Sequence, residues 1–297
     1  MTQGLPTESE AQRFAARLSE GVRALAEYAR TEITPIFLQA TSTLPGAHHV
    51  TVYGLFGRVS GWLSTIATLA QHGGGASDFQ AYQSAARALL ELTVDLAFLA
   101  YPTADPFARM EAWERSARLK HAECTARYRT LHPRATSDGT IQAAFIATHQ
   151  ATIQAERLKY WGKANEHPNR WTARDLLTDA READKLAPGL RLEEYYETLY
   201  RYICWNVHGS SLAGVRGLGN AAIQGVCGFS FYLCGHFGIA STELALRAAA
   251  WNTASQKLVH EMHERFIFGY AGVRVKIDEA TGAEYLEPIS DPKRPLE

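Results

Sequence analysis

The stretch Asp78–Tyr101, which reads DFQAYQSAARALLELTVDLAFLAY, decides the fold. Its core, AARALLELTVDLAFLAY, is apolar on nearly every side of a helix, as is typical of a helix at the centre of a bundle. The exceptions Arg87, Glu91 and Asp95 follow one another at four-residue spacing and therefore share one stripe. Charged groups on a central helix must be paired, so we expect Arg87 and Glu91 to be mostly buried and bonded to polar groups.

Caps and apolar residues at every third or fourth position mark further helices on both sides of this stretch. The first runs from a capping box at Thr7 to about Pro35, where the proline ends it. Thr172 caps another helix, and the segment 221–239 is helical but interrupted by glycines. The remaining helices are expected at about 50–71, 106–131, 140–160, 173–186, 192–208 and 242–268.

The end of the chain has a different pattern. Val273, Val275 and Ile277 alternate with polar residues, which indicates either a small β-hairpin or a loose tail. The sequence thus predicts an all-α, single-domain multi-helix bundle over residues 1–270, followed by this hairpin or tail over residues 271–297.

Composition excludes several classes of protein. With 297 residues, 46% of them hydrophobic, the chain can bury a sizeable core and is not disordered. A net charge of −1 argues against a protein that coats nucleic acid. The four cysteines form no C-x-x-C pair, so reduced thiols in a cytoplasmic protein are expected. The stretch Gly217–Thr242 is long enough to span a bilayer, but its polar residues favour a buried core helix and no membrane partner.

A candidate site lies on the helix Glu193–His208, which reads EEYYETLYRYICWNVH. Arg201 and His208 are about two turns apart, so they share a face roughly 10 Å apart along the axis. An arginine there could stabilise a phosphate while the histidine moves a proton. The alternative is a histidine that caps the helix and an exposed arginine paired with Glu197.

The stripe on the central helix also has two interpretations. It could form a polar pocket together with Tyr200, Arg201 and His208, or Arg87 and Glu91 could form an internal ion pair only. We expect no metal and no cofactor. His260 and His263 do not have the H-E-x-x-H spacing and fit a solvated helix face, and phosphate-binding glycine loops and nucleophile elbows are missing from the sequence.

Two segments together carry a resemblance to known proteins. ARALLELTVDLAFL (Ala86–Leu99) and YETLYRYICWNVHGS (Tyr196–Ser210) resemble a family of uncharacterised bacterial helical proteins, classed as a domain of unknown function. The resemblance covers about residues 50–215. It implies an all-helical fold and supplies no established activity.

The second segment also resembles the motif of the HEPN superfamily, helical ribonucleases of bacterial defence systems that need no metal. The motif is an arginine, four to six residues, then a histidine, as in Arg201-YICWNV-His208. A polar residue usually follows the arginine, whereas this chain has Tyr202, and Asn206 would serve instead. In that superfamily the histidine assists attack by the ribose 2′-hydroxyl, the arginine steadies the phosphate, and a dimer brings two motifs together.

The resemblance therefore implies a ribonuclease of a bacterial defence or stress system, with RNA as partner and a homodimer as the assembly. Arg201 and His208 would be catalytic, supported by a polar cluster of Arg87, Glu91, Asn206 and Tyr200. The alternative is a non-catalytic helical binding or scaffold protein with an unknown protein partner. In that protein the same residues form a structural polar network.

Overall fold

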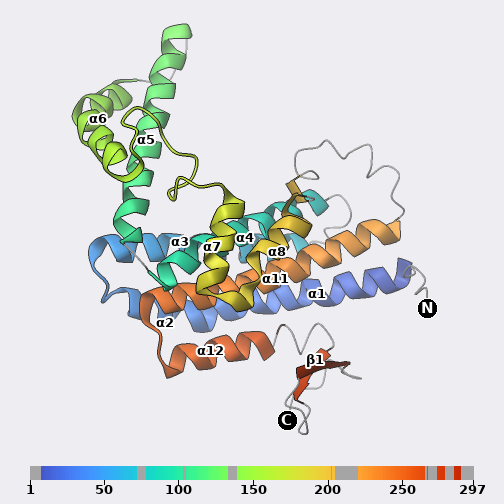
Figure 1. Ribbon diagram of the computed structural model, residues 1–297. Coiled ribbons are helices and arrows are strands. Elements are labelled where there is room, and N and C mark those ends of the chain that lie inside the picture. Colours follow the sequence, from blue (N-terminus) through green and yellow to red (C-terminus); the bar gives the residue numbers. More distant parts are fainter. Residues whose placement is uncertain are drawn as a thin grey trace.

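A computed structural model describes residues 8–71, 78–102, 105–132, 139–201, 203–204, 220–264, 266, 273–277 and 284–288. Over these residues the chain is a bundle of helices accompanied by one two-stranded sheet (Figure 1). The prediction of an all-α multi-helix bundle is confirmed.

The first part of the chain forms a series of helices. They are α1 (Glu8–Tyr28), the π-helical turn η1 (Ala29–Ile33), α2 (Thr34–Thr41), α3 (Gly46–Gln71), α4 (Phe79–Ala100), α5 (Pro106–Leu131) and α6 (Thr140–Trp161). The second half contains α7 (Leu176–Leu186), the 3-10 turn η3 (Pro188–Leu190), α8 (Leu192–Tyr195), the π-helical turn η4 (Tyr196–Tyr200), α11 (Asn220–Ala250), α12 (Thr253–His263), β1 (Val273–Ile277) and β2 (Glu284–Pro288).

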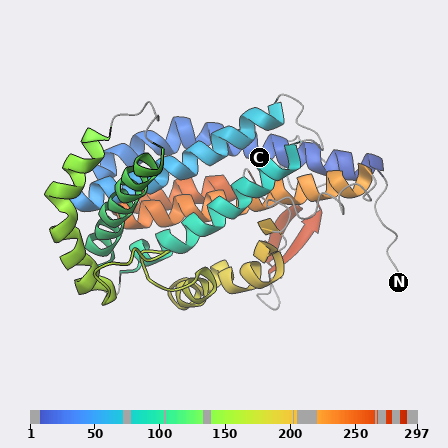
Figure 2. The same ribbon diagram turned by 90° about the horizontal axis from the view of Figure 1, so that it is seen from above.

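The core lies where α4 and α11 pack together. Leu89 on α4 and Phe237 on α11 are almost fully buried, and the hydroxyls of Thr93 and Ser241 join the two helices at 2.8 Å. Figure 2 shows α1 and α3 on one side of this pair and α7 and α8 on the other. The helices α5 and α6 form an arm that projects from the bundle (Figure 1). As expected for a central helix, α4 is covered on most of its surface.

The predicted helix end at Pro35 is wrong, because the chain stays helical through it into α2. A proline cannot donate the usual backbone hydrogen bond, and its ring crowds the carbonyl four residues earlier. The wider turn η1 accommodates this just before the proline. Both the backbone N–H and the hydroxyl of Thr34 donate to the carbonyl of Ala29, the hydroxyl at 2.8 Å. These two bonds keep the chain helical up to the proline.

The predicted interruption near residue 240 is also wrong, since α11 runs unbroken to Ala250. Its glycines allow close packing instead of ending the helix. A Cβ atom at Gly235 would overlap the ring of Phe266, and one at Gly238 would come within 2.7 Å of Leu63. The break comes later, at Asn252, whose side chain accepts a hydrogen bond from the backbone N–H of Ser255 at 3.0 Å.

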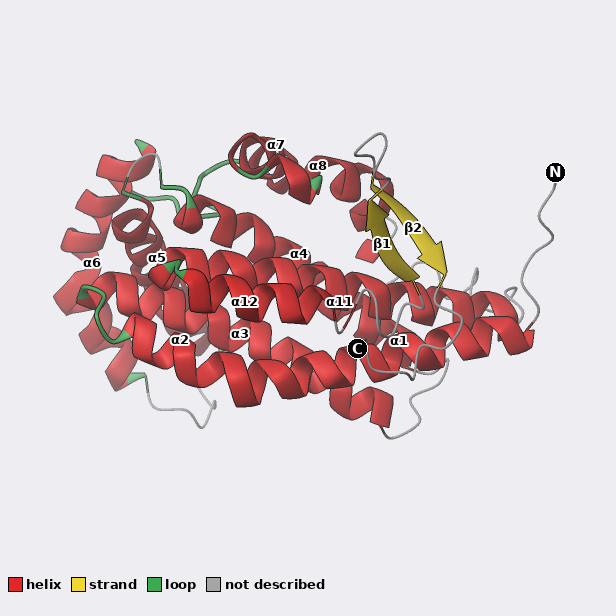
Figure 3. Ribbon diagram, turned by 90° about the horizontal axis from the view of Figure 1, so that it is seen from below, coloured by secondary structure: helices red, strands yellow, loops and turns green. Residues whose placement is uncertain are grey.

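Two smaller predictions concern caps and the end of the chain. Asp175, not Thr172, caps α7, because its carboxylate accepts from the backbone N–H of Thr178 at 2.8 Å. Of the two alternatives for the C-terminal segment, the structure has the hairpin. The strands β1 and β2 are antiparallel, with Val275 opposite Leu286 (Figure 3). The division of the chain at residue 270 stays a prediction.

The apolar stretch 217–242, for which the sequence predicts a buried core helix rather than a membrane span, lies mostly within α11. Among the helices of the described residues, α11 included, none combines the length and the apolar character needed to cross a bilayer.

Candidate functional site

The polar stripe of α4 meets the turn η4 at one tyrosine. Arg87 donates from Nε to Glu91 at 2.9 Å and to the Tyr200 hydroxyl at 3.1 Å. The Tyr200 hydroxyl in turn donates to the same oxygen of Glu91 at 2.6 Å. The three groups form a closed triad, which joins residues more than a hundred positions apart. The predicted contact between the stripe and Tyr200 is present.

Electrostatics keep Arg87 and Tyr200 in the states that the hydrogen bonds require. Burial acts to lower the pKa of Arg87, but its hydrogen bond to Glu91 and the nearby Tyr200 and Glu91 groups outweigh burial and raise it. Burial raises the pKa of Tyr200 well above its usual range, and the hydrogen bond to Glu91 raises it further. Arg87 therefore stays charged and Tyr200 keeps the proton that it donates.

Arg87 and Glu91 are mostly buried and bonded to polar groups, as expected, but their burial is incomplete. Their side chains are 30% and 33% exposed, so the pair lies at the edge of the core. The short turn η4 covers this side of α4, and it supplies a tyrosine over the pair rather than a second long helix. Water can therefore reach both charged groups.

Replacing Glu91 with alanine is expected to lower the free energy of unfolding by about 1–3 kcal/mol, because Arg87 and Tyr200 lose their shared acceptor. The loss of unfolding free energy would be about 3–5 kcal/mol if the pair were fully buried, but both side chains still reach water. Urea unfolding measures the loss. The matched control is Glu111→Ala, which removes a more exposed carboxylate paired with Arg115 one turn away at 3.0 Å. Equal losses in the two variants would contradict the prediction.

The predicted catalytic pair is only partly within the described residues. Arg201 follows η4 directly, and its side chain is 68% exposed. Its ion pair with Glu197 is loose, at 3.8 Å, and is the pairing that the alternative interpretation expected. The described contacts do not bring Arg201 to the triad. Asn206 and His208 lie outside the described residues.

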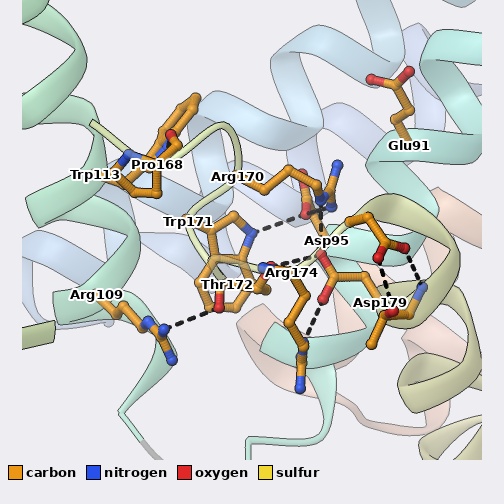
Figure 4. A network of polar contacts seen from close by, with 12 residues as sticks. Glu91, Asp95, Arg109, Trp113, Pro168, Arg170, Trp171, Thr172, Arg174 and Asp179 are labelled. Carbon is orange, nitrogen blue, oxygen red and sulfur yellow. Dashed lines mark hydrogen bonds and ion pairs between the residues drawn. The ribbon is translucent and has the colours of Figure 1, made fainter. Parts of the chain in front are cut away.

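A larger polar network, which the sequence analysis missed, holds the connection between α6 and α7 against α4 (Figure 4). Asp95, the third member of the stripe, accepts from Arg170 at 2.6 Å and from the indole N–H of Trp171 at 2.8 Å. Arg170 continues to Asp179 on α7 at 2.7 Å. Burial raises the pKa of Asp95, against the opposing effect of the positive charge of Arg170.

Asp179 is the centre of this network, and its side chain is fully buried. Besides Arg170 it accepts from the Thr172 hydroxyl at 2.6 Å and from Arg174 at 2.8 Å. Arg109 on α5 donates to the backbone carbonyl of Thr172 at 2.9 Å. With its carboxylate oxygens shared among three donors, Asp179 is occupied in holding the connection, which fits a structural role rather than a chemical one.

A second buried cluster, also missed, pairs a serine with a histidine in the arm. Arg157 donates to the hydroxyl of Ser116 at 2.7 Å, and that hydroxyl lies 2.8 Å from Nδ1 of His167. Burial lowers the pKa of His167 to about 4, and the positive charges of Lys120 and Arg157 add to this effect. A Ser–His pair can serve nucleophilic catalysis. Here Ser116 is fully buried, so the pair links α5 to the connection before α7.

The His167 contact should make stability depend on pH. Its pKa in the folded chain lies below the unfolded value of 6.5, so its contribution is complete above about pH 6.5 and declines as the pH falls toward 4. His167→Gln cannot take up the proton. We expect it to lose less thermal stability between pH 6.5 and 4 than the wild type, as measured by melting temperatures. The exposed His121→Gln is the control, and identical pH profiles for all three proteins would overturn this expectation.

Of the two histidines of α12, His260 matches the solvated helix face that the sequence predicted, whereas His263 is partly buried and burial lowers its pKa. His260 lies 3.1 Å from Glu264 in an exposed pair. Across the described residues, no group of three or more histidine, cysteine, aspartate or glutamate side chains is placed to hold a metal ion.

The fold and the site define the class of the protein: an all-helical bundle whose central helix carries a paired polar stripe. The chain belongs to the family of unknown function DUF5677, whose model matches residues 49–220. This range is more than half of the chain and contains the stripe of α4 and all its partners named above. Membership of an uncharacterised family is thereby confirmed. Searches of the curated proteins and of the solved structures found no match.

Proposed function

We propose that this chain is a HEPN-like ribonuclease of a bacterial defence or stress system that acts without a metal in the cytoplasm. The observation that supports it best concerns Arg201. Its guanidinium is largely exposed and only loosely paired, while the neighbouring Tyr200 is fixed to Glu91 at 2.6 Å. An arginine on an anchored backbone that is free to pair with a phosphate suits phosphate binding.

The proposed chemistry divides two roles between Arg201 and His208. His208 takes the proton from a ribose 2′-hydroxyl as the oxygen attacks the adjacent phosphorus. The bond from phosphorus to the 5′-oxygen breaks, and that oxygen leaves with a proton from solvent. The products are a 2′,3′-cyclic phosphate and a 5′-hydroxyl. Arg201 balances the negative charge that develops on the phosphate. Asn206 and the triad of Arg87, Glu91 and Tyr200 would hold this helix in position.

A second candidate has an observation of its own. Arg87, Glu91 and Tyr200 are hydrogen-bonded to one another in a closed set. This arrangement favours a non-catalytic binding or scaffold protein in which the cluster stabilises the fold.

The two candidates differ in one assay on the full chain. Single-stranded RNA is incubated with the protein in the presence of a chelator, and the ends of the products are analysed. The ribonuclease proposal predicts cleavage that survives the chelator and leaves cyclic phosphate ends. Intact RNA under these conditions would instead support the non-catalytic candidate.

A further inference from the structure

A groove lies between α1 and the second half of α3. These two helices are on the side of the bundle opposite to α8 (Figure 2). It encloses about 640 Å³. Its α3 wall is uncharged, with Ser64 and Ala67 among its residues. Over the whole of α3, Arg58 is the single lysine, arginine, aspartate or glutamate. A partner that enters the groove therefore meets charges from the other wall only.

That other wall carries four charged residues in a specific order. Glu20, Arg23 and Glu27 on α1 and Arg30 on η1, which continues it, follow at intervals of three, four and three, so they form a stripe along one side of the helix. All four are exposed. Glu27 and Arg30 form an ion pair with each other, whereas Glu20 and Arg23 have no ion pair within the part of the chain that the structure describes.

The charges along the stripe alternate, Glu, Arg, Glu, Arg. The same stripe read in the opposite direction therefore presents the opposite charge at each position. When the stripe is laid antiparallel against a second copy, with residue 25 at the centre, Glu20 lies opposite Arg30 of the second copy. In the same arrangement Arg23 lies opposite Glu27. Every carboxylate then lies opposite a guanidinium, and a two-fold axis repeats each contact. Glu20 and Arg23, which have no ion pair within the described part of one chain, each gain one in the dimer.

We infer that this groove is the contact surface of a homodimer, formed by two α1–α3 faces packed antiparallel about a two-fold axis. Small side chains such as Ala67 let the helices approach closely, and the charges of α1 set the register. The two carboxylates and two guanidinium groups of the groove balance one another, so it offers no net positive surface to RNA or another polyanion. This contact lies on the opposite side of the bundle from α8, so it is not a contact that brings two Arg–His motifs together, and the inference does not rest on the proposed ribonuclease activity.

The first test measures the mass of the full chain in solution by light scattering after size-exclusion chromatography, at up to about 100 µM. We expect a dimer for the wild type and a monomer for Ser64→Arg, because the long side chain fills the groove. Thr148→Arg, at an exposed position on α6, is the matched control and should remain a dimer. A monomeric wild type, or a Ser64→Arg dimer as tight as the wild type, would overturn the inference.

The second test checks the register. Arg23→Glu places two carboxylates opposite each other at both symmetric contacts, so the dissociation constant should rise about tenfold or more. Adding Glu27→Arg restores opposite charges across the interface and should recover most of the affinity. Arg118→Glu makes the same change on the arm and should have no effect. If the double variant is as weak as Arg23→Glu alone, this antiparallel register is wrong.

Discussion

Replacing Asp179 with alanine is expected to lower the free energy of unfolding by about 3–5 kcal/mol, the largest loss of stability that we predict for a single substitution. The carboxylate is fully buried and accepts from Arg170, Thr172 and Arg174. Its removal leaves the Arg170 guanidinium, which is 16% exposed, with Asp95 as its remaining ion-pair partner. A buried charge that loses a partner cannot be fully compensated by water.

The matched control for this prediction is Asp175→Ala, four residues earlier. Asp175 is exposed and caps the start of α7 by accepting from the backbone N–H of Thr178. Losing a cap costs about 1 kcal/mol. Denaturant unfolding of both variants measures the difference, and hydrogen exchange should show faster exchange over residues 162–175 in the Asp179 variant only. Comparable stability of the two variants would show that the network contributes little.

The helices were predictable where local signals and packing agree. The helix α5 was expected at 106–131 and has those bounds, because Asp105 caps it and Pro106 fits its first turn. At Pro35 and Gly235 the local signal points to a break, but tertiary structure decides otherwise. A π-helical turn accommodates the proline, and the ring of Phe266 needs the space that a glycine leaves. Neither compensation is visible from neighbouring residues.

The candidate site shows the same contrast between local signals, which the sequence carries, and tertiary packing, which it does not. The spacing of Arg87, Glu91 and Asp95 showed correctly that they share a stripe, because the helical period is fixed. The extent of their burial and the partners of Asp95 depend on which segment covers α4, and Arg170 comes from an irregular connection with no periodic pattern. The usable signal is the density of arginine and aspartate in RWTARDLLTD, residues 170–179, which is high for a stretch whose charges need no pairing.

The largest functional effect is expected from His208→Ala, which should reduce RNA cleavage by about 10²–10⁴-fold through loss of the proton acceptor. Arg201→Ala should reduce cleavage comparably and leave the melting temperature nearly unchanged, because its side chain is 68% exposed and its ion pair is loose. The matched control is Arg191→Ala. That residue is an arginine of similar exposure, 66%, paired with Glu194 three residues later, and its loss should not affect cleavage.

The same variants distinguish the ribonuclease from the non-catalytic candidate. The two candidates predict opposite effects of the His208 substitution on activity and on stability. If His208 serves an open site, its loss removes activity and hardly changes stability. If it belongs to a structural network, the wild type does not cleave RNA, and His208→Ala lowers the free energy of unfolding by about 1–3 kcal/mol because its hydrogen-bond partners are left unsatisfied. Activity that survives both His208→Ala and Arg201→Ala would rule out this motif as the catalytic site.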